Sequence, residues 1–111
     1  PRLIGWSKAS EIIFTGKTLL AQECAEMGLV SHVVNNNEVG ARALEMALQI
    51  ASMAPLAVQS SKRMMRMSMN ETFNDHVHHV FLQLLPLFQS DDFKEGMASF
   101  MEKRDADFRG H

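Results

Sequence analysis

The stretch FTGKTLLAQECAEMGLVSHVV, residues 14–34, places a turn, a helix, a helix stop and an extended run one after another without a gap. Gly16 can end one helix, because glycine adopts the left-handed conformation without a Cβ penalty. Residues 20–27 are predicted to form a second, short helix that Gly28 stops. The run 29–34 is mostly apolar and is predicted to be a short strand, ended by the three asparagines that follow it. These signals alone describe packing and indicate no chemistry.

Outward from this stretch, the chain is predicted to be mainly all-α, with one short strand near 29–34. Capping residues and apolar periodicity predict about six helices, over residues 7–14, 20–27, 37–53, 55–69, 70–85 and 90–104. The apolar face of the fifth helix continues to Phe88, but Pro86 interrupts it. A proline inside a helix costs about 3 kcal/mol, so a kink or an early end near Leu85 is expected. Gly96 in mid-helix costs about 1 kcal/mol relative to alanine, which predicts that another element approaches closely there.

Composition narrows the class of protein. A chain of 111 residues is enough for one domain and too short for two. It carries 11 Lys and Arg against 13 Asp and Glu, which gives no case for a nucleic-acid partner or an anionic membrane. Cys24 is the single cysteine, so no internal disulfide forms and a reducing compartment is expected. No run approaches the roughly 18 apolar residues of a membrane span, and no secretory signal is visible.

Three separated groups of residues resemble, in the right order, the C-terminal region of the enoyl-CoA hydratase/isomerase (crotonase) family. The first group lies near the start of the chain and comprises residues 2–5, Ala9, Glu11, 15–16, Ala21, Glu23, Ala25 and 28–30. The middle group is a proline followed by a serine-lysine pair, Pro55 and 61–62. The last group resembles the family's terminal helix and comprises 90–92, 95–96, 100–104 and Phe108. The resemblance covers nearly the whole chain.

The resemblance implies that the chain lacks an active centre. In this family, the oxyanion-hole N–H groups and the catalytic acids lie in a spiral core that precedes the region seen here. Glu11, Glu23 and Glu26 do not match those acids, so no catalytic residue is predicted. The expected organisation is a single helical domain over 1–111, in which 1–34 joins the missing core and 35–111 caps the CoA site and supports oligomerisation.

Two residues of the last predicted helix are candidates for binding coenzyme A. In the family, the residues that match Phe100 and Lys103 contact the CoA of a neighbouring subunit, near its adenine and phosphates. An aromatic ring can stack on adenine, and an ammonium can pair with phosphate. From residue types alone, Phe100 would belong to a core and Lys103 would only cap the helix. Leu84 and Phe88 are candidates for the wall of the acyl pocket, with core packing as the alternative.

The implied parent protein is an enoyl-CoA hydratase (a lyase) or isomerase of fatty-acid metabolism. It would take an acyl-CoA thioester as substrate, need no cofactor, and form a homo-oligomer, a trimer or a dimer of trimers. The resemblance implies a bacterial cytoplasm or a mitochondrial or peroxisomal matrix as the location, and no targeting signal is visible. The alternative is a non-catalytic helical module that self-associates through exposed apolar faces.

Two polar clusters resemble binding sites but lack features that such sites need. Asp75, His76 and His79 have helical spacing that could bring metal ligands together, but the 3.6 period turns two of them toward solvent, so no metal is predicted. The basic face of Lys62 with two nearby arginines lacks the interleaved aromatics of a nucleic-acid platform, so no nucleic acid is predicted.

Overall fold

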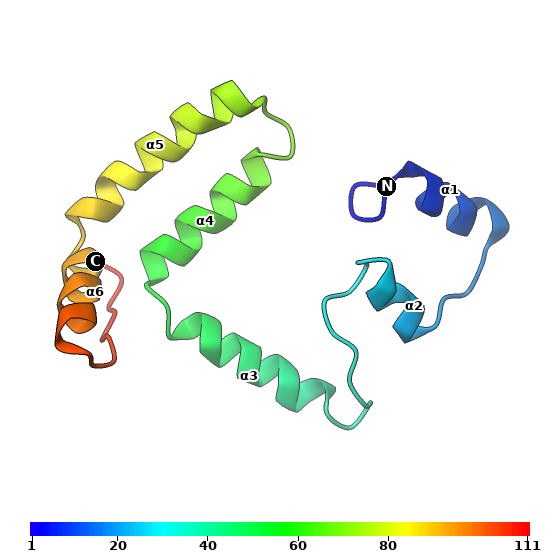
Figure 1. The fold of residues 1–111 in the computed structure, drawn as a ribbon, viewed down its shortest axis with the longest axis horizontal. Helices are drawn as coiled ribbons and strands as arrows, with labels where there is room; N and C mark the ends of the chain where they lie inside the picture. Colours follow the sequence, from blue (N-terminus) through cyan, green and yellow to red (C-terminus); the bar gives the residue numbers. More distant parts are fainter. The chain divides into compact units, whose positions relative to one another are not determined.

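The computed structural model describes all 111 residues and contains six α-helices, as the sequence predicted (Figure 1). In chain order they are α1 (Trp6–Thr15), α2 (Ala21–Glu26), α3 (Val39–Ala51), α4 (Pro55–Met67), α5 (Phe73–Gln89) and α6 (Asp91–Glu102). The chain forms two compact units, residues 1–43 and residues 44–111. None of the helices combines the length and the apolar character that crossing a bilayer requires.

Two glycines end the helices of the first unit. Gly16 follows α1 with φ 64°, and Gly28 follows α2 with φ 77°, so both adopt the left-handed conformation. After α2, the Gly28 N–H donates to the Ala25 carbonyl at 3.0 Å and the Leu29 N–H donates to the Cys24 carbonyl at 2.8 Å. These bonds satisfy carbonyls that the helix end leaves free. The predicted helix stops are confirmed.

The predicted strand at 29–34 is wrong. These residues form turns and irregular backbone, and the structure contains no strand. A strand needs a neighbour to complete its hydrogen-bond ladder, and no second extended segment pairs with this one. Its apolar side chains remain open: Leu29 is 39% exposed and Val30 is 41% exposed. The apolar run therefore forms partly exposed apolar surface and not a strand of a sheet.

Pro86 does not end its helix, so the expected early end near Leu85 is wrong. Helix α5 continues to Gln89 with the proline inside it. A proline removes the one hydrogen bond that would reach the carbonyl four residues earlier, that of Leu82. Pro86 and Leu82 are both exposed, so water can satisfy this carbonyl. The Thr72 hydroxyl accepts a hydrogen bond from the Asp75 N–H at 3.3 Å and caps the start of the helix.

The second unit is built around α4, α5 and α6. Helix α5 packs against both α4 and α6. Between α4 and α5, Gln83 Oε1 accepts hydrogen bonds from the buried Ser60 hydroxyl at 3.4 Å and from Arg63 Nη2 at 3.1 Å. After α6 the chain turns and runs back along the helix as residues 103–111, called here the tail (Figure 1). The close approach predicted at Gly96 is present, because a Cβ there would lie 3.6 Å from the Phe108 ring.

Candidate functional site

Phe100 and Lys103 both lie open to solvent at the C-terminal end of α6. The Phe100 side chain is 80% exposed, so it belongs to no core within this chain. Lys103 is exposed and takes the left-handed conformation, with φ 54° and ψ 44°. It is the one residue other than glycine with a positive φ. A side chain in this conformation costs about 1 to 2 kcal/mol, so something in the structure must hold it there.

Bonds on both sides of Lys103 fix the chain at this point. The Lys103 N–H donates to the Phe100 carbonyl at 3.4 Å, and the Arg104 N–H donates to the Ser99 carbonyl at 3.1 Å. The Arg104 guanidinium forms two parallel bonds to the Glu95 carboxylate, of which Nη2 to Oε2 is 2.9 Å. Its Nε also donates to Glu102 Oε2 at 2.6 Å. The structure places no carboxylate in an ion pair with Lys103.

Glu95 joins the tail to the helix. Besides the Arg104 guanidinium, it accepts a hydrogen bond from the Asp107 N–H at 2.8 Å. These partners lower the pKa of the Glu95 carboxyl from 4.5 to about 2, the Arg104 hydrogen bond being the larger cause and the Asp107 N–H the second. Glu95 is therefore a carboxylate at every physiological pH.

Docking of the tail is expected to weaken as the pH falls from about 4.5 toward 2. The pKa of Glu95 is lower in the folded chain, so its stabilising effect is complete above 4.5 and is lost as the carboxyl gains a proton. NMR titration should show the Asp107 amide moving with an apparent pKa near 2. This step should vanish in Glu95→Gln. An unchanged Asp107 amide between pH 4.5 and 2 would contradict the role given to Glu95.

Asp92 anchors the far end of the tail. This carboxylate is only 5% exposed and accepts hydrogen bonds from the Arg109 N–H at 2.7 Å and from the Gly110 N–H at 3.0 Å. The N–H groups of Asp91 and Asp92 have no partner within α6, because they lie at its start. They donate instead to the His111 carbonyl, at 2.8 and 3.2 Å. The sequence indicated only helix capping here. The anchor was missed because its partners lie 17 and 18 residues away, beyond any helical period.

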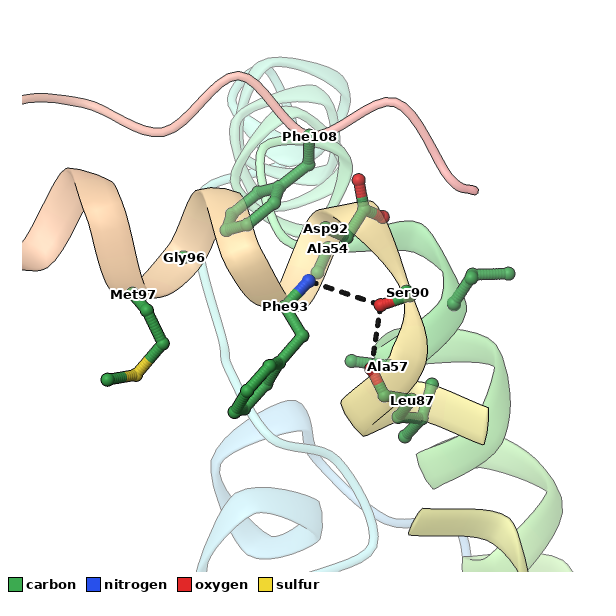
Figure 2. A pocket seen from close by; sticks show the side chains of 10 residues that line it. Ala54, Ala57, Leu87, Ser90, Asp92, Phe93, Gly96, Met97 and Phe108 are labelled. Atoms are coloured by element: carbon green, nitrogen blue, oxygen red, sulfur yellow. Dashed lines mark hydrogen bonds between the residues drawn. The ribbon is translucent and has the colours of Figure 1, made fainter. Parts of the chain in front are cut away.

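An apolar cavity of about 240 Å³ lies where α4, α5, α6 and the tail meet (Figure 2). Phe93, Met97 and Phe108 border it from α6 and the tail. Its one hydroxyl, that of Ser90, already donates to the Leu87 carbonyl at 2.7 Å and accepts from the Phe93 N–H at 3.1 Å. The cavity can hold an apolar group, but it offers no free acid, base or nucleophile.

Leu84 and Phe88, the candidates for the acyl-pocket wall, lie on α5 and do not line this cavity. Leu84 is 37% exposed and Phe88 is 54% exposed. The Phe88 ring contacts Phe93 edge to face, with centroids 5.1 Å apart. Phe93 precedes Lys103 by ten residues, or about 15 Å of helix. Leu84 and Phe88 therefore do not form one small site with Phe100 and Lys103 within this chain.

The histidines of α5 face a different acid from the one considered in the sequence. Asp75 is used at the helix start, where its Oδ2 accepts from the Thr72 hydroxyl at 2.6 Å. His76 and His79 instead each place Nδ1 at 3.1 Å from Glu71 Oε2. These contacts lower the pKa of Glu71, His79 contributing most. The structure contains no group of three or more such side chains arranged to hold a metal ion.

The model of one protein family, described as enoyl-CoA hydratase/isomerase, matches residues 1–111. Among curated proteins, the chain is 38% identical over 113 residues to "Enoyl-CoA hydratase EchA19" of Mycobacterium tuberculosis, covering 97% of this chain and 41% of that protein. It is 39% identical to "Probable enoyl-CoA hydratase, mitochondrial" of Dictyostelium discoideum, covering 93% and 37%. It is also 34% identical to "Methylmalonyl-CoA decarboxylase" of Escherichia coli, covering 96% and 42%.

Solved structures show the same relation. An enoyl-CoA hydratase from Bacillus anthracis superposes with a TM-score of 0.97 at 33% identity, covering 100% of this chain and 43% of that one. An enoyl-CoA hydratase from Mycobacterium tuberculosis superposes with a TM-score of 0.94 at 31% identity, covering 100% and 44%. The chain thus spans about two fifths of the length of the proteins that it matches.

Proposed function

Because this chain belongs to the enoyl-CoA hydratase/isomerase family, we propose that it is the C-terminal part of an enzyme acting on acyl-CoA thioesters in fatty-acid metabolism. Within that enzyme its work is to close the CoA site and to hold subunits together. Support comes from a match over the whole chain that covers only 41% of a relative. A bacterial cytoplasm or an organelle matrix fits the bacterial and mitochondrial names among the relatives.

The chemistry of the parent enzyme is assigned to the part that precedes this chain. There, two backbone N–H groups would stabilise the enolate oxyanion of the thioester, where negative charge develops. A positioned carboxylate would move the α-proton, and in a hydratase a second acid would deliver water. One relative is called a decarboxylase, so the reaction type varies among proteins with a similar C-terminal region. Hydratase or isomerase chemistry is decided outside residues 1–111.

The observation that carries the proposal is the pair of open side chains at the end of α6. Phe100 lies in the last turn of α6 and Lys103 directly follows the helix, so both open side chains belong to the same helix end and are proposed to contact one ligand. A ring that is 80% exposed can stack on adenine, and an ammonium without an ion-pair partner can meet a phosphate. For Leu84 and Phe88 we propose only that the acyl chain or a neighbouring subunit covers their exposed apolar surface.

A chimera tests the pair. In the Bacillus anthracis hydratase, the region that this chain covers would be replaced by this chain. Lys103→Ala is expected to raise KM for crotonyl-CoA about tenfold, equivalent to about 1.4 kcal/mol, while kcat stays unchanged. The lost contact is a charge-assisted bond to a part of the substrate remote from the reacting atoms.

Lys94→Ala is the matched control, because Lys94 is also an exposed lysine of α6 but pairs with Asp91 at the other end of the helix. Its KM should equal that of the unmodified chimera. Equal KM values for the Lys103→Ala and Lys94→Ala chimeras would contradict the proposed CoA contact.

A second function is favoured by a separate observation. Large apolar side chains are exposed on every helix except α2, for example Phe14 at 80%, Leu48 at 61% and Phe81 at 67%. Such surface promotes association, so the chain could act as a non-catalytic module that binds copies of itself. This function needs no CoA contact, and the chimera therefore separates it from the first.

A further inference from the structure

The left-handed turn at Lys103 lies between two fixed points. On one side is the last turn of α6, which contains the Phe100 carbonyl that accepts the Lys103 N–H. On the other side is Arg104, whose guanidinium is held by Glu95 from the preceding turns of the same helix. The backbone of residue 103 is therefore held from both directions, which fixes the point from which its side chain leaves the helix end.

Arg104 also changes the electrostatics of this helix end. Its guanidinium forms ion pairs with the carboxylates of two acids of α6, Glu95 and Glu102. Either acid, if released, could pair with Lys103 and compete with an anionic ligand. Because both are already paired, Lys103 keeps its charge open to solvent.

The rest of the tail supports this arrangement without depending on Glu102. Glu95 accepts the Asp107 N–H, while Asp92 accepts the N–H groups of Arg109 and Gly110. Glu102 contacts the tail only through Arg104, two residues away. Glu95 and Glu102 therefore have the same charge and share one partner, but only Glu95 ties that partner to a distant part of α6.

We infer that Glu95 is a positioning residue, which acts through Arg104 to hold Lys103 and Phe100 in one orientation for the phosphates and adenine of CoA. The inference rests on the proposed function, since it assumes that this pair meets CoA. It assigns Glu95 no contact with the ligand. Glu95 affects binding only through the geometry of the turn.

Charge and geometry make opposite predictions for Glu95→Gln. Removing a negative charge near the phosphate site should by itself tighten the binding of an anion. Loosening the turn should weaken it, because the open ammonium must then be ordered when the ligand binds. Weaker binding after loss of a negative charge is therefore a result that simple electrostatics does not give.

The test uses the Bacillus anthracis chimera described above, in which the preceding core is present, and coenzyme A itself as the probe in a calorimetric titration at low salt. In this chimera Glu95→Gln is expected to raise the Kd for coenzyme A at least about fivefold, and Glu102→Gln, the matched control, to leave it within about twofold or to lower it. The far-UV circular dichroism of each variant should match that of the unmodified chimera, which reports that the variants remain folded. Arg104→Lys keeps the positive charge without the two parallel bonds and should show an intermediate Kd.

The outcomes separate this inference from the proposed function. Binding of coenzyme A with equal Kd in the unmodified chimera and in its Glu95→Gln variant would overturn the positioning role alone. Equal weakening by Glu95→Gln and Glu102→Gln would also overturn it, because the effect would then follow charge. Equal Kd values in the unmodified chimera and in its Lys103→Ala variant would contradict the proposed CoA contact of Lys103, and the positioning role with it.

Discussion

In light scattering at micromolar concentration, the 111-residue chain is expected to have a mass well above the 12.5 kDa of one copy. Ala9 is its only buried apolar residue, and no large side chain is fully buried. Burial gains about 25 cal/mol per Å² of apolar surface, so covering the exposed apolar side chains favours association.

Paired substitutions on α3 check that the association is apolar. Leu48 is 61% exposed, and Leu48→Lys should lower the average mass, because a buried ammonium without a partner opposes assembly. Gln49→Lys adds the same charge at an exposed polar position next to it and should leave the mass unchanged. A monodisperse monomer from the unmodified chain would contradict both the assembly role and the self-associating module.

The sequence predicted the helices well because their signals are local. Gly16 and Gly28 end α1 and α2 through a conformation that glycine alone adopts without cost. Ser90 caps α6 through a bond to an N–H three residues away. Each of these signals lies within one turn of the helix end that it determines.

The sequence failed where the outcome depends on a distant partner. The apolar run at 29–34 has strand character, but nothing in the chain pairs with it, and sequence pattern cannot show that a partner is missing. Pro86 was expected to kink α5 or to end it near Leu85, yet the helix continues to Gln89 because one lost hydrogen bond at an exposed position is tolerated. Both errors came from applying a local rule without the surroundings.

The candidate site also contains parts that the sequence indicated and parts that it did not. Phe100 and Lys103 were assigned through the family resemblance, and the exposure of Phe100 agrees with a ligand contact without testing it. The bonds from Glu95 and Asp92 to the tail could not be predicted. They join a helix to an irregular segment 9 to 18 residues later, where no periodicity applies.

The most direct test of the account is hydration of crotonyl-CoA, followed by the loss of the enoyl thioester absorbance. The 111-residue chain and the Bacillus anthracis chimera would be compared at equal concentration. Turnover is expected from the chimera and not from the isolated chain, because the proposed function places the catalytic acids and the oxyanion hole in the preceding core. Turnover by the pure isolated chain would contradict it.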